Sequence, residues 1–195
     1  MVRKLIFLTI IILIILLLYI SKQYSSTSEK NDYMNKIIFF NNYLNENFDL
    51  EERVIKNFNE AFYLLINNFP EFTKLVSPIE MIAIGFLETT FRNITGDAGK
   101  SLGFFQVQEP TYWFVKHHYT EVFETVGFTG PWLWKDVEKR ADVQLITSIL
   151  YLHYLKIHDE GKAYFHYNGG SMIYQNNAEK ILENLYKEYI EKSGL

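Results

Sequence analysis

The stretch from Ser77 to Gln108 most constrains the fold, because it opens as a capped apolar helix and ends in turn-forming residues. Ser77 is followed by Pro78 and then by Glu80, a pattern typical of a helix N-terminus. Apolar side chains then recur at helical spacing, at Ile79, Ile82, Ala83 and Phe86. Glu88 falls in the last turn, where the helix dipole does not favour an acid. We therefore expect a buried helix whose terminal carboxylate is either solvated or placed for a function.

Composition narrows the class of protein. Hydrophobic residues make up 48% of the 195 residues and aromatic residues 17%, which is typical of a folded domain and not of a disordered chain. There is no cysteine, which excludes disulfides, thiolate metal sites, a cysteine nucleophile and a lipoprotein anchor.

The N-terminus carries a candidate membrane segment. Arg3 and Lys4 precede an uncharged run over residues 5–20, and a polar stretch follows it. The run is near the lower limit for a spanning helix and long for a signal-peptide core. No A-x-A cleavage site follows, which favours a retained signal anchor with its basic end in the cytoplasm. A cleaved signal is the alternative, and it would make the protein secreted.

Charge excludes one class of partner. The whole chain has 19 basic and 23 acidic residues, and residues 1–24 contain three of the basic ones and none of the acidic ones. The exported part is therefore more acidic than the whole chain, which argues against nucleic acid as a partner.

The rest of the chain is predicted to be all-α, with one minor β-hairpin over residues 99–107. Helical spacing and turn signals predict helices at 33–48, 50–69, 77–88, 111–128, 136–157, 162–167 and 177–192. We expect three segments: the anchor at 1–24, a linker with N-terminal helices at 25–70, and a catalytic domain at 71–195.

The candidate chemistry rests on a carboxylate. The five histidines form no metal-binding pattern, and nucleotide-binding and serine-hydrolase motifs are absent from the sequence, so we predict neither a metal nor a cofactor. Glu88 follows Phe86 and Leu87, and partial desolvation is expected to raise its pKa. A protonated glutamate of this kind can donate a proton to a glycosidic oxygen.

Three segments resemble the ordered motifs of lytic transglycosylases. They are Glu88-Thr89-Thr90-Phe91, Gly103-Phe104-Phe105-Gln106-Val107 and Tyr167-Asn168-Gly169-Gly170. The likeness is to the soluble-lytic-transglycosylase (SLT) type, related to goose-type lysozymes, whose motifs are Glu-Ser-x-Phe, Gly-Leu-Met-Gln and Ala-Tyr-Asn-x-Gly. It covers about residues 72–170.

The resemblance implies a lysozyme-like helical domain that cleaves peptidoglycan between N-acetylmuramic acid and N-acetylglucosamine. Together with the N-terminal segment, this predicts a protein of the bacterial cell envelope, anchored in the cytoplasmic membrane. Glu88 would be the single acid and then base, and the muramic 6-hydroxyl would attack to leave a 1,6-anhydro end. The resemblance also implies substrate-binding residues: Thr89, Ser101, Phe105, Gln106, Tyr167 and Asn168. The partners would be glycan strands, and cell-envelope or secretion-machinery proteins where the domain serves such a machine.

Asp97 leaves the chemistry open. It precedes Gln106 by the spacing at which goose-type lysozymes carry an aspartate, and a second carboxylate would permit inverting hydrolysis. The other interpretation is that Gly96-Asp97 forms a turn. Gln106 could likewise be a structural amide bonded to the backbone.

Several aromatic and histidine positions have two interpretations. Trp113, Trp132 and Trp134 could stack on sugars or belong to the core. His166 replaces the family alanine and could line the rim or face solvent. A non-catalytic glycan-binding scaffold is the alternative to an enzyme.

Overall fold

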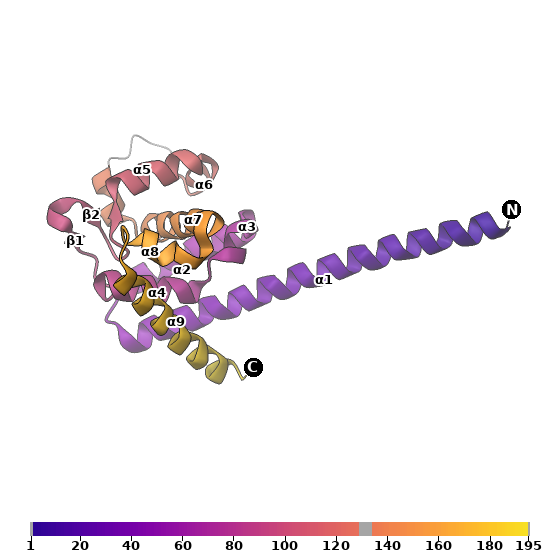
Figure 1. The fold of residues 1–195 in the computed structure, drawn as a ribbon, viewed down its shortest axis with the longest axis horizontal. Helices are drawn as coiled ribbons and strands as arrows, with labels where there is room; N and C mark the ends of the chain where they lie inside the picture. Colours follow the sequence, from indigo (N-terminus) through magenta and orange to yellow (C-terminus); the bar gives the residue numbers. More distant parts are fainter. Residues whose placement is uncertain (1, 129–133, 195) are drawn as a thin grey trace. The chain divides into compact units, whose positions relative to one another are not determined.

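The computed structural model describes residues 2–128 and 134–194, with the side chains of 2–10 and 20–26 left out. It is mostly helical with one small sheet, which confirms the all-α prediction with a minor β element (Figure 1). The chain divides into two compact units, Met1–Asn35 and Lys36–Leu195.

Helix α1 (Val2–Asn47) is continuous where the sequence predicts a polar linker after residue 24. The reason is that residues 1–47 contain no glycine and no proline, so nothing in the polar stretch breaks the helix. Within the predicted membrane run only Ile11–Tyr19 have described side chains, and these are exposed. No helix in the described part of the chain combines the length and the apolar character needed to cross a membrane.

The second unit begins with the end of α1 and contains the candidate site. Its α-helices are α2 (Glu52–Asn68), α3 (Pro70–Leu75), α4 (Pro78–Thr89), α5 (Glu109–His118), α6 (Thr120–Thr125), α7 (Ala141–Asp159), α8 (Ala163–Tyr167) and α9 (Met172–Ser193). Its short 3₁₀ helices are η1 (Asp97–Gly99), η2 (Trp134–Lys139) and η3 (Glu160–Lys162). Residues 36–70 therefore belong to the same unit as the helices that follow, unlike the predicted division at residue 70.

Helix α7 is the centre of this unit, and it packs against α2, α3, α5 and α8. Most of its residues are buried, from Ala141 through Leu155. The buried residues of α2 include Phe58, Phe62 and Leu65, all with 0% exposure. Burying aromatic and aliphatic side chains in this way supplies most of the stability of a helical domain.

The sheet is a three-stranded antiparallel meander of two-residue strands: β1 (Thr95–Gly96), β2 (Ser101–Leu102) and β3 (Val107–Gln108). Thr95 pairs with Leu102, and Leu102 pairs with Val107. The predicted hairpin is thus present with one extra strand. The turns that join the strands hold non-glycine residues in the left-handed region, namely Asp97, Ala98 and Gln106.

Several predicted helix boundaries differ from the structure: α2 begins at Glu52 rather than at residue 50, and α9 begins at Met172 rather than near residue 177. Helix α7 begins at Ala141, because the residues before it form η2. The predicted segment 111–128 is two helices, α5 and α6, separated at Tyr119. The predicted turn at Gly130-Pro131 lies outside the described residues.

Candidate active site

Helix α4 places Glu88 at one edge of a cavity. The helix starts as predicted: the Ser77 hydroxyl accepts from the Glu80 amide, and the Glu80 carboxylate accepts from the Ser77 amide at 2.9 Å. It ends at Thr90, which adopts the left-handed conformation of a helix C-cap. The helix is buried from Pro78 to Gly85, and Glu88 lies in the more exposed last turn.

The end of α4 is fastened to the sheet through Thr89. Its hydroxyl donates to the Phe104 carbonyl at 2.8 Å and accepts from the Arg92 amide at 3.1 Å. These bonds fix the position of Glu88, one residue away, relative to the turn between β2 and β3.

Gln106 holds that turn together. Its Nε2 donates to the carbonyls of Ile94 at 3.0 Å and Gly103 at 2.9 Å, so both amide hydrogens are used. Its Oε1 accepts from Ser101 Oγ at 2.7 Å, and the same Oγ lies 3.1 Å from Asp97 Oδ2. The structural role foreseen for Gln106 is therefore present, while the residue also borders the cavity.

Two glycines make room for this arrangement. A Cβ at Gly96 would lie 1.8 Å from Gln106 Oε1. A Cβ at Gly103, which has a φ of +82°, would lie 2.0 Å from Oε1 of Gln144. That buried Oε1 accepts from the Phe104 amide at 2.9 Å, so Gln144 on α7 anchors the turn from below.

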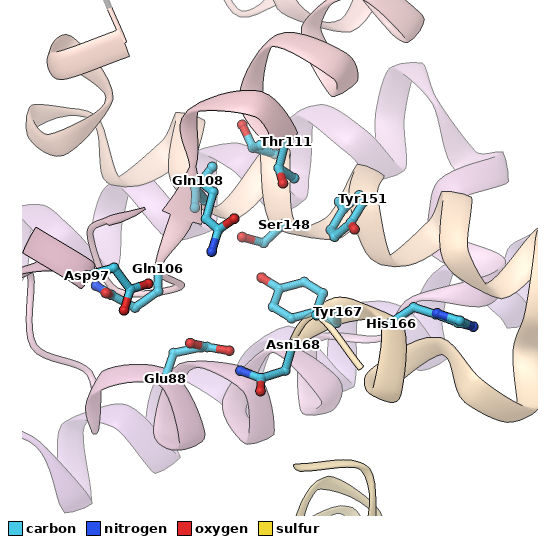
Figure 2. Close-up of a pocket in the computed structure, with 13 residues that line it drawn as sticks. Glu88, Asp97, Gln106, Gln108, Thr111, Ser148, Tyr151, His166, Tyr167 and Asn168 are labelled. Atoms are coloured by element: carbon cyan, nitrogen blue, oxygen red, sulfur yellow. The ribbon is translucent and has the colours of Figure 1, made fainter. Parts of the chain in front are cut away.

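The cavity has a volume of about 360 Å³, within the usual range for ligand sites. Its lining residues are Glu88, Asp97, Gln106, Val107, Gln108, Thr111, Thr147, Ser148, Tyr151, His166, Tyr167, Asn168 and Gly169. In Figure 2, Glu88 and Asn168 lie on one side and Gln108, Thr111 and Ser148 on the other, with Asp97 at one end and Tyr151 at the other.

The electrostatics favour a protonated Glu88. Burial raises the pKa of its carboxyl, and the negative charge of Asp97 acts in the same direction. Hydrogen bonding from Tyr174 and Asn168 partly opposes this rise in pKa because it favours the ionised form. The rise agrees in direction with the sequence prediction. It gives a carboxylic acid able to hold a proton at higher pH than a solvated glutamate.

Tyr167 reaches the same space from α8. Its hydroxyl donates to the Phe105 carbonyl at 3.4 Å. Burial raises the pKa of this hydroxyl, and the nearby charge of Glu88 raises it further, so the phenol stays neutral. Its ring lies 5.6 Å from that of Tyr151, which extends the aromatic wall along the cavity.

Five of the predicted site residues line the cavity in the structure, and three do not. Glu88, Asp97, Gln106, Tyr167 and Asn168 all line the cavity. Thr89, Ser101 and Phe105 do not, and their exposed fractions are 3%, 0% and 0%. These three side chains are buried in other contacts: Thr89 and Ser101 hold backbone and loop in place, and the Phe105 ring packs on Phe58.

The sequence prediction missed the wall supplied by α7. Polar residues recur there at helical spacing within an apolar helix, at Gln144, Thr147, Ser148 and Tyr151. That polar stripe was the available signal, because a buried helix rarely carries polar residues on one line without a partner or a cavity to face. Gln108 and Thr111, from the β3–α5 junction, gave no comparable pattern.

The structure places His166, Trp113 and Trp134, whose surroundings the sequence left open. His166 borders the cavity while remaining exposed, and its Nε2 lies 3.3 Å from Asp159 Oδ2. Trp134 is buried, whereas Trp113 is 44% exposed and donates to Glu109. Neither of these tryptophans lines the cavity, and Trp132 lies outside the described residues.

No group of three histidine, aspartate or glutamate side chains in the described part of the chain is arranged to hold a metal ion. Comparison with protein-family models, with curated proteins and with solved structures found no match.

Proposed function

We propose that this chain is a peptidoglycan lytic transglycosylase in which Glu88 acts as the single acid and base. The observation that carries the proposal is the state of Glu88: a half-buried carboxyl with a raised pKa, on the wall of a polar cavity, at the end of a rigid helix. The three-motif resemblance supplies the substrate.

The proposed reaction has two steps, and Glu88 is the residue that gives a proton in the first and takes one in the second. The Glu88 carboxylic acid donates its proton to the glycosidic oxygen as the bond from muramic C1 breaks. The carboxylate then takes the proton of the muramic 6-hydroxyl while that oxygen bonds to C1. Glu88 ends in its starting state, and the product carries a 1,6-anhydro ring.

The position of Asp97 favours a mechanism in which Glu88 is the single catalytic residue. Asp97 Oδ2 lies 3.1 Å from Ser101 Oγ, and the residue sits at an exposed position in a strained turn. A water-activating base needs a carboxylate directed at a water across the sugar from the acid. The Asp97 carboxylate instead lies against Ser101 of its own loop, which favours internal transfer.

Inverting hydrolysis is the second candidate, favoured by one observation: Asp97 lines the same cavity as Glu88. The test is a digest of purified peptidoglycan sacculi by the full chain, with the products analysed by mass. Transfer gives anhydro ends, which are lighter by one water than the reducing ends of hydrolysis. Asp97→Asn should leave the rate of fragment release nearly unchanged for transfer and abolish it for hydrolysis.

We further propose, on sequence grounds, that residues 5–20 hold the protein in the cytoplasmic membrane with the second unit outside the cytoplasm. The support is the basic pair Arg3-Lys4 followed by the uncharged run. Fractionation of cells that express the full chain, followed by extraction at high pH, tests this. Release of the protein by alkali would contradict it.

A non-catalytic glycan-binding role is the remaining alternative. It predicts that the chain binds sacculi without releasing fragments and that Glu88→Gln leaves the binding unchanged.

A further inference from the structure

The wall of the cavity supplied by α7 accepts hydrogen bonds and has none left to donate. Thr147 and Ser148 form this α7 wall, with exposed fractions of 0% and 1%. The Thr147 hydroxyl donates to the Val143 carbonyl at 2.7 Å. The Ser148 hydroxyl donates to the Gln144 carbonyl at 2.9 Å. Because each hydroxyl has one hydrogen, both hydrogens are used within the helix, and a ligand meets only the lone pairs of these oxygens.

The end of the cavity at Asp97 is also short of donors. Gln106 uses both of its amide hydrogens, on the carbonyls of Ile94 and Gly103. The Ser101 hydroxyl has a single hydrogen and lies near two acceptors, Gln106 Oε1 at 2.7 Å and Asp97 Oδ2 at 3.1 Å. Within the described residues, no other group is within hydrogen-bond distance to donate to the Asp97 carboxylate. A donor from a ligand would therefore complete this end of the cavity.

The charge of the cavity lining favours a ligand of the same kind. The described lining residues include two carboxyl side chains, Glu88 and Asp97, and neither lysine nor arginine. His166 is exposed at the border, with its Nε2 3.3 Å from Asp159 Oδ2. In Figure 2 both carboxyl groups lie toward the end of the cavity away from Tyr151. An anionic ligand would be repelled at that end, whereas a cation would be attracted.

Side chains with hydrogens left to donate lie at the border of the cavity instead. Gln108 and Asn168 are exposed, and Thr111 and Tyr151 are partly exposed. The hydroxyls of a sugar both donate and accept, so a sugar can give hydrogens to the α7 wall while it accepts them from the border. The arrangement fits a ligand whose donating groups face α7 and Asp97.

We propose that the cavity prefers an amino sugar with a free, protonated amine, and that the Asp97 carboxylate holds this amine. The inference rests on the proposed function in taking the ligand to be a sugar, while the preference for a cation rests on the contacts of Asp97 and the charge of the lining. An ammonium group offers three hydrogens and a positive charge. An N-acetyl group on the same carbon offers one hydrogen and no charge. The preferred substrates are thus glycan strands that have lost some of their N-acetyl groups.

Three β-1,4-linked tetramers that differ at one carbon of each ring test this preference. They are the tetramers of glucosamine, N-acetylglucosamine and glucose, which carry an ammonium, an acetamide and a hydroxyl at that carbon. Isothermal titration calorimetry measures their binding to the full chain in detergent, in mildly acidic buffer at low salt and at about 1 M salt. Mass spectrometry after each titration checks that the tetramers are intact.

We expect the glucosamine tetramer to bind about tenfold more tightly than the other two at low salt, as for a hydrogen bond that joins charged groups. Most of this preference should disappear at about 1 M salt, where the Debye length falls to roughly 3 Å. The salt series uses the wild-type chain, so it tests the proposal independently of any variant.

Asp97→Asn removes the charge and keeps the size of the side chain. Asparagine tolerates the left-handed conformation of residue 97, which has a φ of 49°, so the variant should fold, as thermal melts can verify. Its affinity for the glucosamine tetramer should fall to that for the neutral tetramers. Asp49→Asn is the matched control, because Asp49 is exposed, does not line the cavity and should keep the preference when changed.

Equal binding of the three tetramers at low salt, or binding of none of them, would overturn the inference. A preference that persists in Asp97→Asn would also overturn it, since the amine would then be held elsewhere. The proposed function fails by a different result: a wild-type chain that releases no fragments from sacculi is not a lytic enzyme, and the tetramer series would still decide which sugar the cavity prefers.

Discussion

The ring of Phe91 lies against the backbone of Gly85, so close that a Cβ at residue 85 would stand 2.5 Å from Phe91 Cζ. Phe91 adopts a positive φ of 54°, and its amide donates to the Gly85 carbonyl at 3.2 Å. The chain thus folds back onto the end of α4 directly after Glu88. This contact fixes where the helix stops and where the carboxyl emerges.

Gly85→Ala should therefore destabilise the protein although alanine is the better helix former. The gain in helix propensity is about 1 kcal/mol, and overpacking against the buried Phe91 ring costs about 1–3 kcal/mol. Chemical denaturation measures the net free energy of unfolding. Gly161→Ala is the control, because a Cβ there meets nothing within 4 Å. Equal or higher stability of Gly85→Ala would contradict this role of Phe91.

The turn between β1 and β2 stores strain that can be relieved. Ala98 is exposed and has a φ of 54°, a conformation that is costly for a residue with a Cβ. Ala98→Gly should raise the free energy of unfolding by roughly 0.5–1 kcal/mol. The neighbouring Gly99, with a φ of +92°, provides the reciprocal test, since Gly99→Ala should lower the stability. A fall in melting temperature for Ala98→Gly would count against strain at this turn.

His153 should make the fold sensitive to acid. It is 7% exposed, and its Nδ1 has no partner in the described structure. Burial lowers its pKa below the usual 6.5; the charge of Glu71 partly opposes this and the charge of Lys156 adds to it. The folded state thus favours the neutral ring. The resulting stability is present above about pH 6.5 and is lost as the pH falls through the lowered folded-state value.

His153→Leu should reduce the slope of unfolding free energy against pH below about pH 6.5. Denaturant titrations at a series of pH values measure that slope. His117→Leu, at an exposed position on α5, controls for the loss of any histidine. An unchanged slope in His153→Leu would show that the acid sensitivity arises elsewhere.

Much of this fold can be predicted from local signals. The cap at Ser77, the apolar spacing of α4 and α7, and the glycines after α8 are each determined by neighbouring residues. The sequence did not predict that α1 continues to Asn47. A polar stretch forms a linker only where glycine or proline also breaks the helix, and α1 contains neither.

The site was only partly predictable, because burial is a property of the whole fold. Thr89 and Phe105 occupy motif positions, and a motif does not reveal which face of the backbone meets solvent.

The most direct test of the central role of Glu88 is the rate at which soluble fragments are released from sacculi by Glu88→Gln. Glutamine keeps the size of the side chain and removes the titrating proton, so the rate should fall by about 10²–10⁴-fold, as expected for loss of a general acid. Glu121→Gln, at an exposed position on α6, makes the same change of charge and should keep the wild-type rate. Release by Glu88→Gln at the wild-type rate would contradict the assignment of Glu88 as the acid and base.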